Sequence, residues 1–192
     1  MFSNNFVVVY DSCILYSAYL RDLLIEMALK EVFRAKWTKT IHEEWLNNLL
    51  NKRPELSKEK LERTISLMNE EVPDSLVENY ESLIESLELP DPSDRHVLAA
   101  AIKANAQVIV TYNLKDFPKA ELQKYNIEAQ DPDNFLDNLI NLAPDMVLAS
   151  VKEIQTRLKN PTKTIDELIE IYNARKLESL CTFLQENLNQ FV

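Results

Sequence analysis

The amino-acid sequence predicts an α/β protein. Residues 6–10 and 108–110 are short, continuous apolar runs, Phe-Val-Val-Val-Tyr and Val-Ile-Val. Strands that are buried on both faces, as in a parallel sheet covered by helices, have this composition. Between these runs, apolar residues follow Asp94 at spacings of three, four, seven and eight, which is the pattern of one buried helix face. Strands separated by helices indicate the α/β class.

The other elements follow in order along the chain. A helix is expected from Ser12 to about Lys30, and the next helix begins at Thr38 or at Thr40, where Glu43 would complete a capping box. The remaining expected elements are a short strand or extended connector at 35–37 and a strand at 127–129. Helices are expected at 57–71, 75–88, 94–104 and 131–140, and two or more helices in 144–190, divided at 159–161. The helices at 57–71 and 75–88 would form an arm that either packs on the sheet or serves as a surface for a dimer or another partner.

Length and composition limit the class of protein. The chain has 192 residues, of which 46% are hydrophobic, so it can bury a sizeable core in one domain with an appendage. No apolar run approaches the ~20 residues of a membrane span. The N-terminal residues lack the charged start and apolar stretch of a signal peptide. The two cysteines are too few for a disulfide framework, so we expect a protein of the reducing cytoplasm.

Glycine is absent from the whole sequence. A P-loop and a GxGxxG phosphate cradle both need glycine, so nucleotide-binding Rossmann proteins and kinases are excluded. Backbone positions with positive φ must then be occupied by other residues, and Asn and Asp tolerate them best. Asn105, after the helix that ends near Ala104, is the expected left-handed cap of that helix.

Three aspartates stand at the ends of the central elements. Asp11 directly follows the first apolar run, Asp94 opens the helix that precedes the second run, and Asp116 lies just beyond that run. Sites in open α/β sheets form beyond the carboxyl ends of the strands, so we expect these side chains to face one crevice. Cys13 begins the next helix beside Asp11, whose charge opposes thiolate formation, and no base partner is evident, so it is not expected to be a nucleophile.

Four blocks of sequence, in their order and spacing, resemble the PIN-domain family. The blocks are VVVYDSCIL, WTKTIHEEWLNNLL, DPSDRHVLAAAI and VIVTYNLKDFP, within residues 6–142. The resemblance implies a three-layer α/β/α sandwich with a central, mostly parallel sheet, here followed by a C-terminal helical extension. It also implies a Mg²⁺- or Mn²⁺-dependent ribonuclease, such as the VapC-type toxins, which act on RNA and are held by a small antitoxin protein. We therefore expect a nuclease domain at 1–142 and a helical extension at 143–192.

The family pattern, carried over block by block, implies four catalytic and metal-ligating acids. They are Asp11, Glu44, Asp94 and Asp116. Clustered carboxylates are the hard oxygen ligands that Mg²⁺ and Mn²⁺ prefer. Without the other blocks, Glu44 would be read as a surface glutamate beside the capping Glu43.

The fourth block departs from the commonest family pattern. Many PIN domains carry an acid where Asn113 stands, so either Asn113 or Asp116 fills the fourth position. Thr111 is expected to position a water or a phosphate, and Asn113 to orient the neighbouring carboxylates. His96 is expected to be peripheral, because two residues turn a helix by ~200° from Asp94. His42 has no nearby metal-ligand partner and is expected to be a packed histidine.

The net charge of the chain and the local charge near the expected site bear differently on an RNA substrate. The net charge of −10 opposes phosphate binding, which needs a cationic surface. However, residues 30–53 hold six basic and three acidic residues, and residues 95–125 hold five and two. The acidity is concentrated in residues 55–91, with eleven acidic and three basic residues. The segments that flank the expected site are therefore basic.

Two alternatives remain open at this stage. One is a degenerate PIN-like module that binds RNA or protein without catalysis, which the intact acids disfavour. The other is a phosphohydrolase that resembles haloacid-dehalogenase enzymes and uses Asp11 as its nucleophile, but Cys13 occupies the position of that family's second acid. We expect a homodimeric, cytoplasmic ribonuclease with no membrane association.

Overall fold

A computed structural model describes residues 6–191, with an open, four-stranded parallel sheet at its centre. Residues 1–5, part of the segment in which no signal peptide was expected, lie outside the described residues. The strands are β1 (Val7–Tyr10), β2 (Arg34–Lys36), β3 (Val108–Val110) and β4 (Glu128–Gln130), and their order across the sheet is β2-β1-β3-β4. All three pairings are parallel, with Val8 opposite both Ala35 and Val108. The prediction of a parallel α/β sheet is confirmed.

Helices make up most of the rest of residues 6–191. In chain order they are α1 (Ser12–Leu15), α2 (Ala18–Leu29), α3 (Lys39–Lys52), α4 (Lys58–Glu71), α5 (Glu81–Ile84), η1 (Pro92–Asp94), α6 (Arg95–Lys103), η2 (Leu114–Asp116), α7 (Lys119–Leu122), η3 (Gln123–Tyr125), α8 (Pro132–Leu142), α9 (Pro144–Arg157), α10 (Ile165–Asn173), α11 (Glu178–Glu186) and η4 (Leu188–Phe191). The elements labelled η are 3₁₀ turns. Among the described residues, no helix is both long and apolar enough to cross a membrane.

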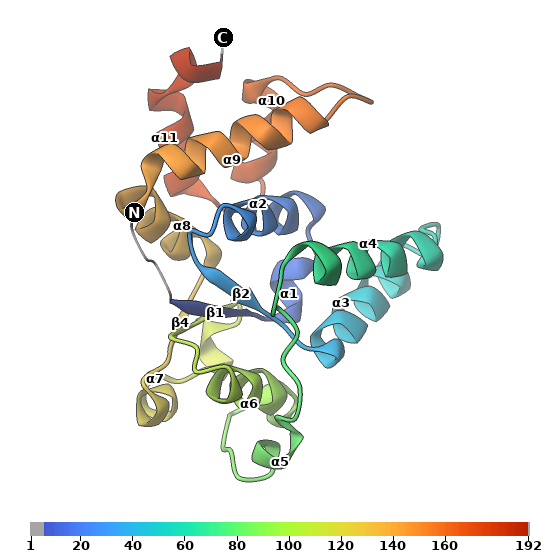
Figure 1. Ribbon diagram of the computed structural model, residues 1–192, viewed down its shortest axis with the longest axis vertical. Helices are drawn as coiled ribbons and strands as arrows, with labels where there is room; N and C mark the ends of the chain where they lie inside the picture. The colour runs from blue at the N-terminus through green and yellow to red at the C-terminus, as the bar shows by residue number, and fades with distance from the viewer. Residues whose placement is uncertain (1–5, 192) are drawn as a thin grey trace.

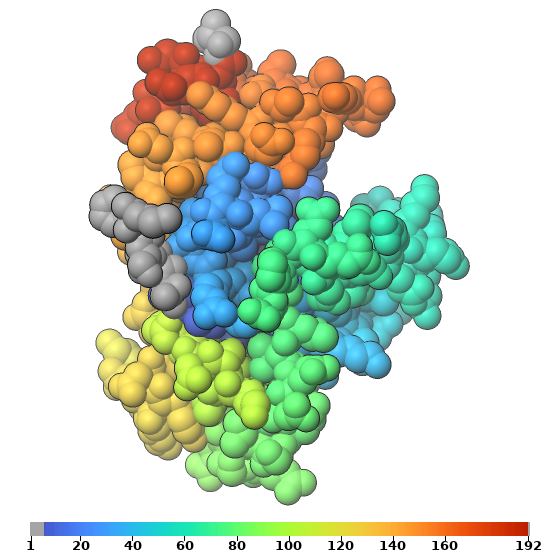
Figure 2. All heavy atoms as spheres, in the orientation of Figure 1, coloured from blue at the N-terminus to red at the C-terminus, as the bar shows by residue number. Residues whose placement is uncertain are grey.

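The helices cover the sheet on both faces. Figure 1 shows α2 and α8 above the sheet and α6 and α7 below it. The helices α9, α10 and α11 pack against α2 and α8, so that they form an additional layer outside the sandwich. In Figure 2 these C-terminal helices occupy the upper part of the molecule, and α4 projects to the side. The expected three-layer sandwich with a C-terminal helical extension is confirmed.

The central strands are buried because their side chains are apolar on both faces. Val8, Val9, Tyr10, Ile109 and Val110 have no exposed surface. Removing this much apolar surface from water is the main stabilising contribution, at ~25 cal/mol per Å². Three consecutive buried alanines, residues 99–101, lie in α6, which packs against β1 and β3.

The single helix expected at residues 12–30 is in fact two helices. The chain leaves the α conformation at Ser17, whose backbone is extended with ψ 116°, and α2 begins at the next residue. Two side-chain contacts stabilise this break, one local and one long-range. Arg21 Nη1 donates to the Leu15 carbonyl at 2.8 Å, and Arg175 Nε donates to Ser17 Oγ at 2.5 Å.

The prediction of one helix at 75–88 was wrong: within that range, only α5 is helical. Residues near Leu76 are extended because they pair with the chain beyond β2: Trp37 N–H donates to the Ser75 carbonyl at 2.9 Å, and Val77 N–H to the Trp37 carbonyl at 2.8 Å. The capping box at Thr40 is also wrong. Thr38 caps α3 by accepting from the Ile41 N–H at 3.1 Å, while the Thr40 hydroxyl bonds to that of Tyr80.

Two other predictions, about where helices end, are confirmed. Asn105 follows α6 with φ 51°, in the left-handed region. The C-terminal helices are divided between α9 and α10, where Thr164 and Glu167 form a capping box for α10. The boundary proposed at residues 142 and 143 falls between α8 and α9.

Candidate functional site

The Asp11 carboxylate lies at the carboxyl end of β1, between β1 and β3. Its backbone N–H donates to the Val110 carbonyl at 3.1 Å, which extends the parallel ladder by one residue. Only 5% of Asp11 is exposed. Its Oδ2 atom accepts hydrogen bonds from Thr111 Oγ1 at 2.6 Å and from Cys13 Sγ at 3.1 Å. These contacts hold the carboxylate in one orientation.

Thr111 and Asn113 each form a hydrogen bond with one of the neighbouring acids. The Thr111 hydroxyl donates to Asp11 and accepts from the Asn113 N–H at 2.9 Å, so it positions an acid. Its expected contact with a water or a phosphate stays a prediction. The Asn113 carbonyl accepts from the Asp116 N–H at 2.9 Å. Asn113 therefore orients Asp116 through its main chain, while its side chain is exposed.

Asp94 and Asp116 approach Asp11 from the other elements. Asp94 ends the 3₁₀ turn η1 at the start of α6, and Asp116 is a buried residue in η2. The pKa of Asp94 is raised to about 6 by burial and by the negative charges of Asp11, Asp91 and Asp116, which His96 partly offsets. Asp94 Oδ2 is buried and has no hydrogen-bond partner among residues 6–191. Asp11 and Asp116 thus lie near enough to Asp94 for their charges to disfavour its ionised form.

Glu44 lies on α3 and contacts His96 on α6. Their Oε1 and Nε2 atoms are 2.8 Å apart, although the ring N–H is not aligned as a hydrogen bond. His96 is 8% exposed, and the expectation that it is peripheral was wrong. The expected rotation assumed α-helical geometry from Asp94 onward, whereas Asp94 belongs to a 3₁₀ turn and α3 supplies the contact. The sequence feature that could have indicated the position of His96 is that it belongs to the same sequence block as Asp94.

Two further titratable residues near the site behave as predicted. His42 is buried and accepts from Trp45 Nε1 at 3.0 Å, and burial lowers its pKa to about 4, so it is a packed, neutral histidine. Burial and the charge of Asp11 raise the pKa of Cys13 to about 12. Cys13 is therefore a thiol that donates to Asp11 at neutral pH.

The donor set has the chemistry of a site for a hard divalent cation. Carboxylate oxygens suit Mg²⁺ and Mn²⁺, and an unpartnered, buried oxygen on Asp94 beside two other acids gains from a cation. Within the described part of the chain, no three His, Cys, Asp or Glu side chains lie close enough to hold an ion together. Mg²⁺ commonly binds through one or two carboxylates and keeps several waters, so the residues fit such an ion.

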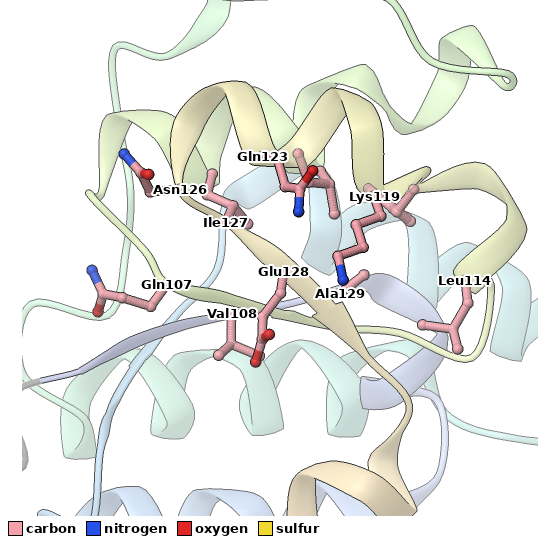
Figure 3. Close-up of a pocket in the computed structure, with 11 residues that line it drawn as sticks. Gln107, Val108, Leu114, Lys119, Gln123, Asn126, Ile127, Glu128 and Ala129 are labelled. Atoms are coloured by element: carbon pink, nitrogen blue, oxygen red, sulfur yellow. The ribbon is translucent and has the colours of Figure 1, made fainter.

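A large cavity lies away from these acids. It has a volume of about 680 Å³ and is enclosed by α7, η3 and the edge strand β4. Figure 3 shows Lys119 and Glu128 at this cavity, together with Gln107 and Asn126 from the chain before β3 and β4. None of the four predicted acids lines it. The candidate site is thus the end of the sheet at Asp11, and cavity size alone would not have identified it.

Comparisons with known proteins agree with this architecture. A family model described as "PIN domain" matches residues 7–115, and a model described as "VapC50 C-terminal domain" matches residues 132–186. A Mycobacterium tuberculosis protein named "Putative ribonuclease VapC50" is 40% identical over 77 residues, which are 40% of this chain and 46% of the relative. The chain thus spans just under half of the length of this relative. No solved structure matches. Since the PIN model covers more than half of the chain, including Asp11, Glu44 and Asp94, the protein belongs to the PIN domain family.

Proposed function

We propose that this protein is a Mg²⁺- or Mn²⁺-dependent endoribonuclease that hydrolyses phosphodiester bonds in RNA. One observation carries the proposal: a buried carboxylate oxygen of Asp94 has no partner among residues 6–191, and the charges of Asp11 and Asp116 raise the pKa of the same carboxyl. Membership of the PIN family and the name of the ribonuclease relative support it.

The proposed roles of the residues follow from their contacts. Asp11, Asp94, Asp116 and Glu44 would hold the cation, one or two of them directly and the others through its bound waters. A divalent ion in such a site supplies charge neutralisation at the phosphate and an activated water. Thr111 fixes the Asp11 carboxylate, and His96 restrains Glu44. The burial of Asp11 and Asp116 keeps bulk water away from the ligands and strengthens their interaction with a cation.

A purified-protein assay tests the proposal. We expect the protein to cleave single-stranded RNA in Mg²⁺ or Mn²⁺, to lose cleavage in EDTA, and to regain it when the metal is restored. Cleavage that persists in EDTA would contradict the metal-dependent chemistry. A protein that never cleaves would favour the non-catalytic PIN module, for which the lack of three closely grouped ligands in the described residues is the supporting observation. Calorimetry with Mg²⁺ on wild type and Asp11→Ala would then show whether the acids bind metal at all.

We further propose that the protein is the toxin of a type II toxin–antitoxin pair, acts in the cytoplasm and forms a homodimer. The name of the relative and the match of residues 132–186 to the VapC50 C-terminal model support this assignment. We expect the protein to co-purify with a small partner when the adjacent gene is co-expressed. Normal growth of cells that express the wild-type chain alone, with active nuclease in their extract, would contradict the toxin assignment.

A further inference from the structure

A second concave surface adjoins the candidate site, and we call it the basic pocket. It has a volume of about 580 Å³ and lies between α1, α3, the loop after β3 and the turn between α10 and α11. Its lining includes three cations, Lys52, Arg175 and Lys176, and the aromatic residues Tyr16 and Tyr112. Segments from both ends of the chain therefore build one pocket.

The charge of the basic pocket is opposite to that of the whole protein. The chain has a net charge of −10, yet no acidic side chain is among the residues that line the pocket. Within residues 6–191, neither Lys52 nor Lys176 forms an ion pair, and both residues are exposed. The Lys52 ammonium lies 5.1 Å from the centroid of the Tyr16 ring. Unneutralised cations in a concave site attract an anion.

The aromatic wall of the pocket is held in place by the C-terminal extension. Tyr112 is 44% exposed, and its hydroxyl donates to the Arg175 carbonyl at 3.2 Å. Arg175 is itself fixed, because its guanidinium donates to Ser17 Oγ and to the Ile171 carbonyl and lies 5.3 Å from the Tyr19 ring. An exposed, oriented aromatic ring beside free lysines is the combination that binds single-stranded nucleic acid, in which bases stack and phosphates meet cations.

The basic pocket is continuous with the acids. Cys13 lines the pocket and donates to Asp11 Oδ2 at 3.1 Å, and Tyr112 directly follows Thr111, which also donates to Asp11. A strand whose phosphate lies at Asp11 therefore has its neighbouring nucleotides at the pocket. We propose that the basic pocket binds single-stranded RNA next to the scissile bond, with Lys52 and Lys176 on phosphates and the Tyr112 ring against a base. This proposal rests on the proposed ribonuclease function and assigns the C-terminal extension a part in substrate binding.

Binding measurements on an inactive background test the pocket. In the Asp11→Asn variant of the full chain, we would measure fluorescence anisotropy of a labelled oligouridylate of about ten nucleotides. Lys52→Glu and Lys176→Glu should each weaken binding at least about tenfold. Each should also reduce the slope of log affinity against log salt by ~0.7, the value for one phosphate contact with a single strand. Lys159→Glu, an exposed lysine of the same extension outside the pocket, is the matched control and should change neither quantity.

Two variants of Tyr112 distinguish the contribution of base stacking from that of the hydrogen bond to the Arg175 carbonyl. Tyr112→Phe keeps the ring but removes the hydroxyl, and it should retain binding. Tyr112→Ala should weaken binding about fivefold or more, since a base stacked on an aromatic ring contributes at least ~1 kcal/mol. Equal loss in the two variants would contradict stacking.

The outcomes separate the two proposals. If wild type cleaves RNA but neither lysine reversal changes binding or its salt dependence, the basic pocket is not the RNA site. If wild type does not cleave while the lysine variants lose binding, the pocket stands and the proposed catalysis fails. Urea melts of each variant confirm that folded proteins are compared.

Discussion

The Asp94 carboxylate shows, at the scale of one residue, what the candidate site requires. One of its oxygens is buried without a partner among the described residues, and its pKa is raised to about 6 by burial and by three other carboxylates. A raised pKa means that the folded protein disfavours the charged form of this acid. A bound cation would reverse this preference, which is the behaviour expected of a metal ligand.

Glu44 and Glu43 provide a matched pair of adjacent acids on α3. Glu44 lies 2.8 Å from the buried His96, whereas Glu43 is exposed and pairs with Lys39 one turn away. We predict that Glu44→Gln lowers cleavage at least about tenfold, the loss typical for residues that hold or orient a metal, and that Glu43→Gln leaves it unchanged. Initial cleavage rates at saturating Mg²⁺ measure both effects. Equal rates for the two variants would remove Glu44 from the site.

At the scale of elements, local sequence predicted the strands and most helices, but not the breaks between them. The runs at β1 and β3 are apolar on both faces, which is a local property that the sequence displays. The break at Ser17 is stabilised by the local bond from Arg21 and by Arg175, 158 residues later, and the extended chain at Leu76 pairs with Trp37. The contacts of Arg175 and Trp37 are tertiary, so the local sequence near residues 17 and 76 does not reveal them.

The contact between α2 and α9 ties the C-terminal extension to the sandwich. Glu26 is 5% exposed and forms ion pairs with Arg157, at 2.9 Å, and with Lys30, at 3.1 Å. We predict a coupling free energy of roughly 1 kcal/mol or more between Glu26→Gln and Arg157→Met, because removing Arg157 alone leaves a buried charge less compensated. Urea melts of the four proteins in the double-mutant cycle measure it.

The exposed pair Lys58–Glu62 on α4 is the control for that cycle. Its side chains are 61% and 53% exposed, so water screens the interaction. An identical cycle on this pair should give a coupling of ~0.5 kcal/mol or less. If the buried pair gives no more than the exposed pair, the Glu26 contact does not fix the extension.

At the scale of the whole molecule, the charge is divided by region. The sequence showed that residues 55–91 are acidic and that the segments around the expected site are basic. It did not reveal the basic pocket, because Lys52, Tyr112 and Lys176 come from three distant segments that only the fold brings together. It also led to the prediction that Asp11, Asp94 and Asp116 face one crevice, because strand ends in a parallel sheet meet at one edge. The effect of the Asp11 and Asp116 charges on the pKa of Asp94 supports this prediction. The metal-ligating role of the three aspartates stays a prediction.

The most direct test of the account is the Asp11→Asn variant, measured for both cleavage and stability. Asparagine keeps the shape and removes one of the crowded charges. The Thr111 hydroxyl can donate or accept, so the change preserves its contact. We predict loss of nearly all cleavage in Mg²⁺. In EDTA, we expect a free energy of unfolding no lower than that of wild type, because like-charge repulsion is relieved.

The exposed Asp145→Asn, in the first turn of α9, is the control and should keep wild-type cleavage. A purely structural Asp11 would give the opposite result. Stability would fall by ~0.5–2 kcal/mol, as when a helix cap is removed, and cleavage would decline only in proportion to the folded protein. Urea melts in EDTA beside cleavage assays in Mg²⁺ distinguish the two, and a destabilised but active Asp11→Asn would contradict the site.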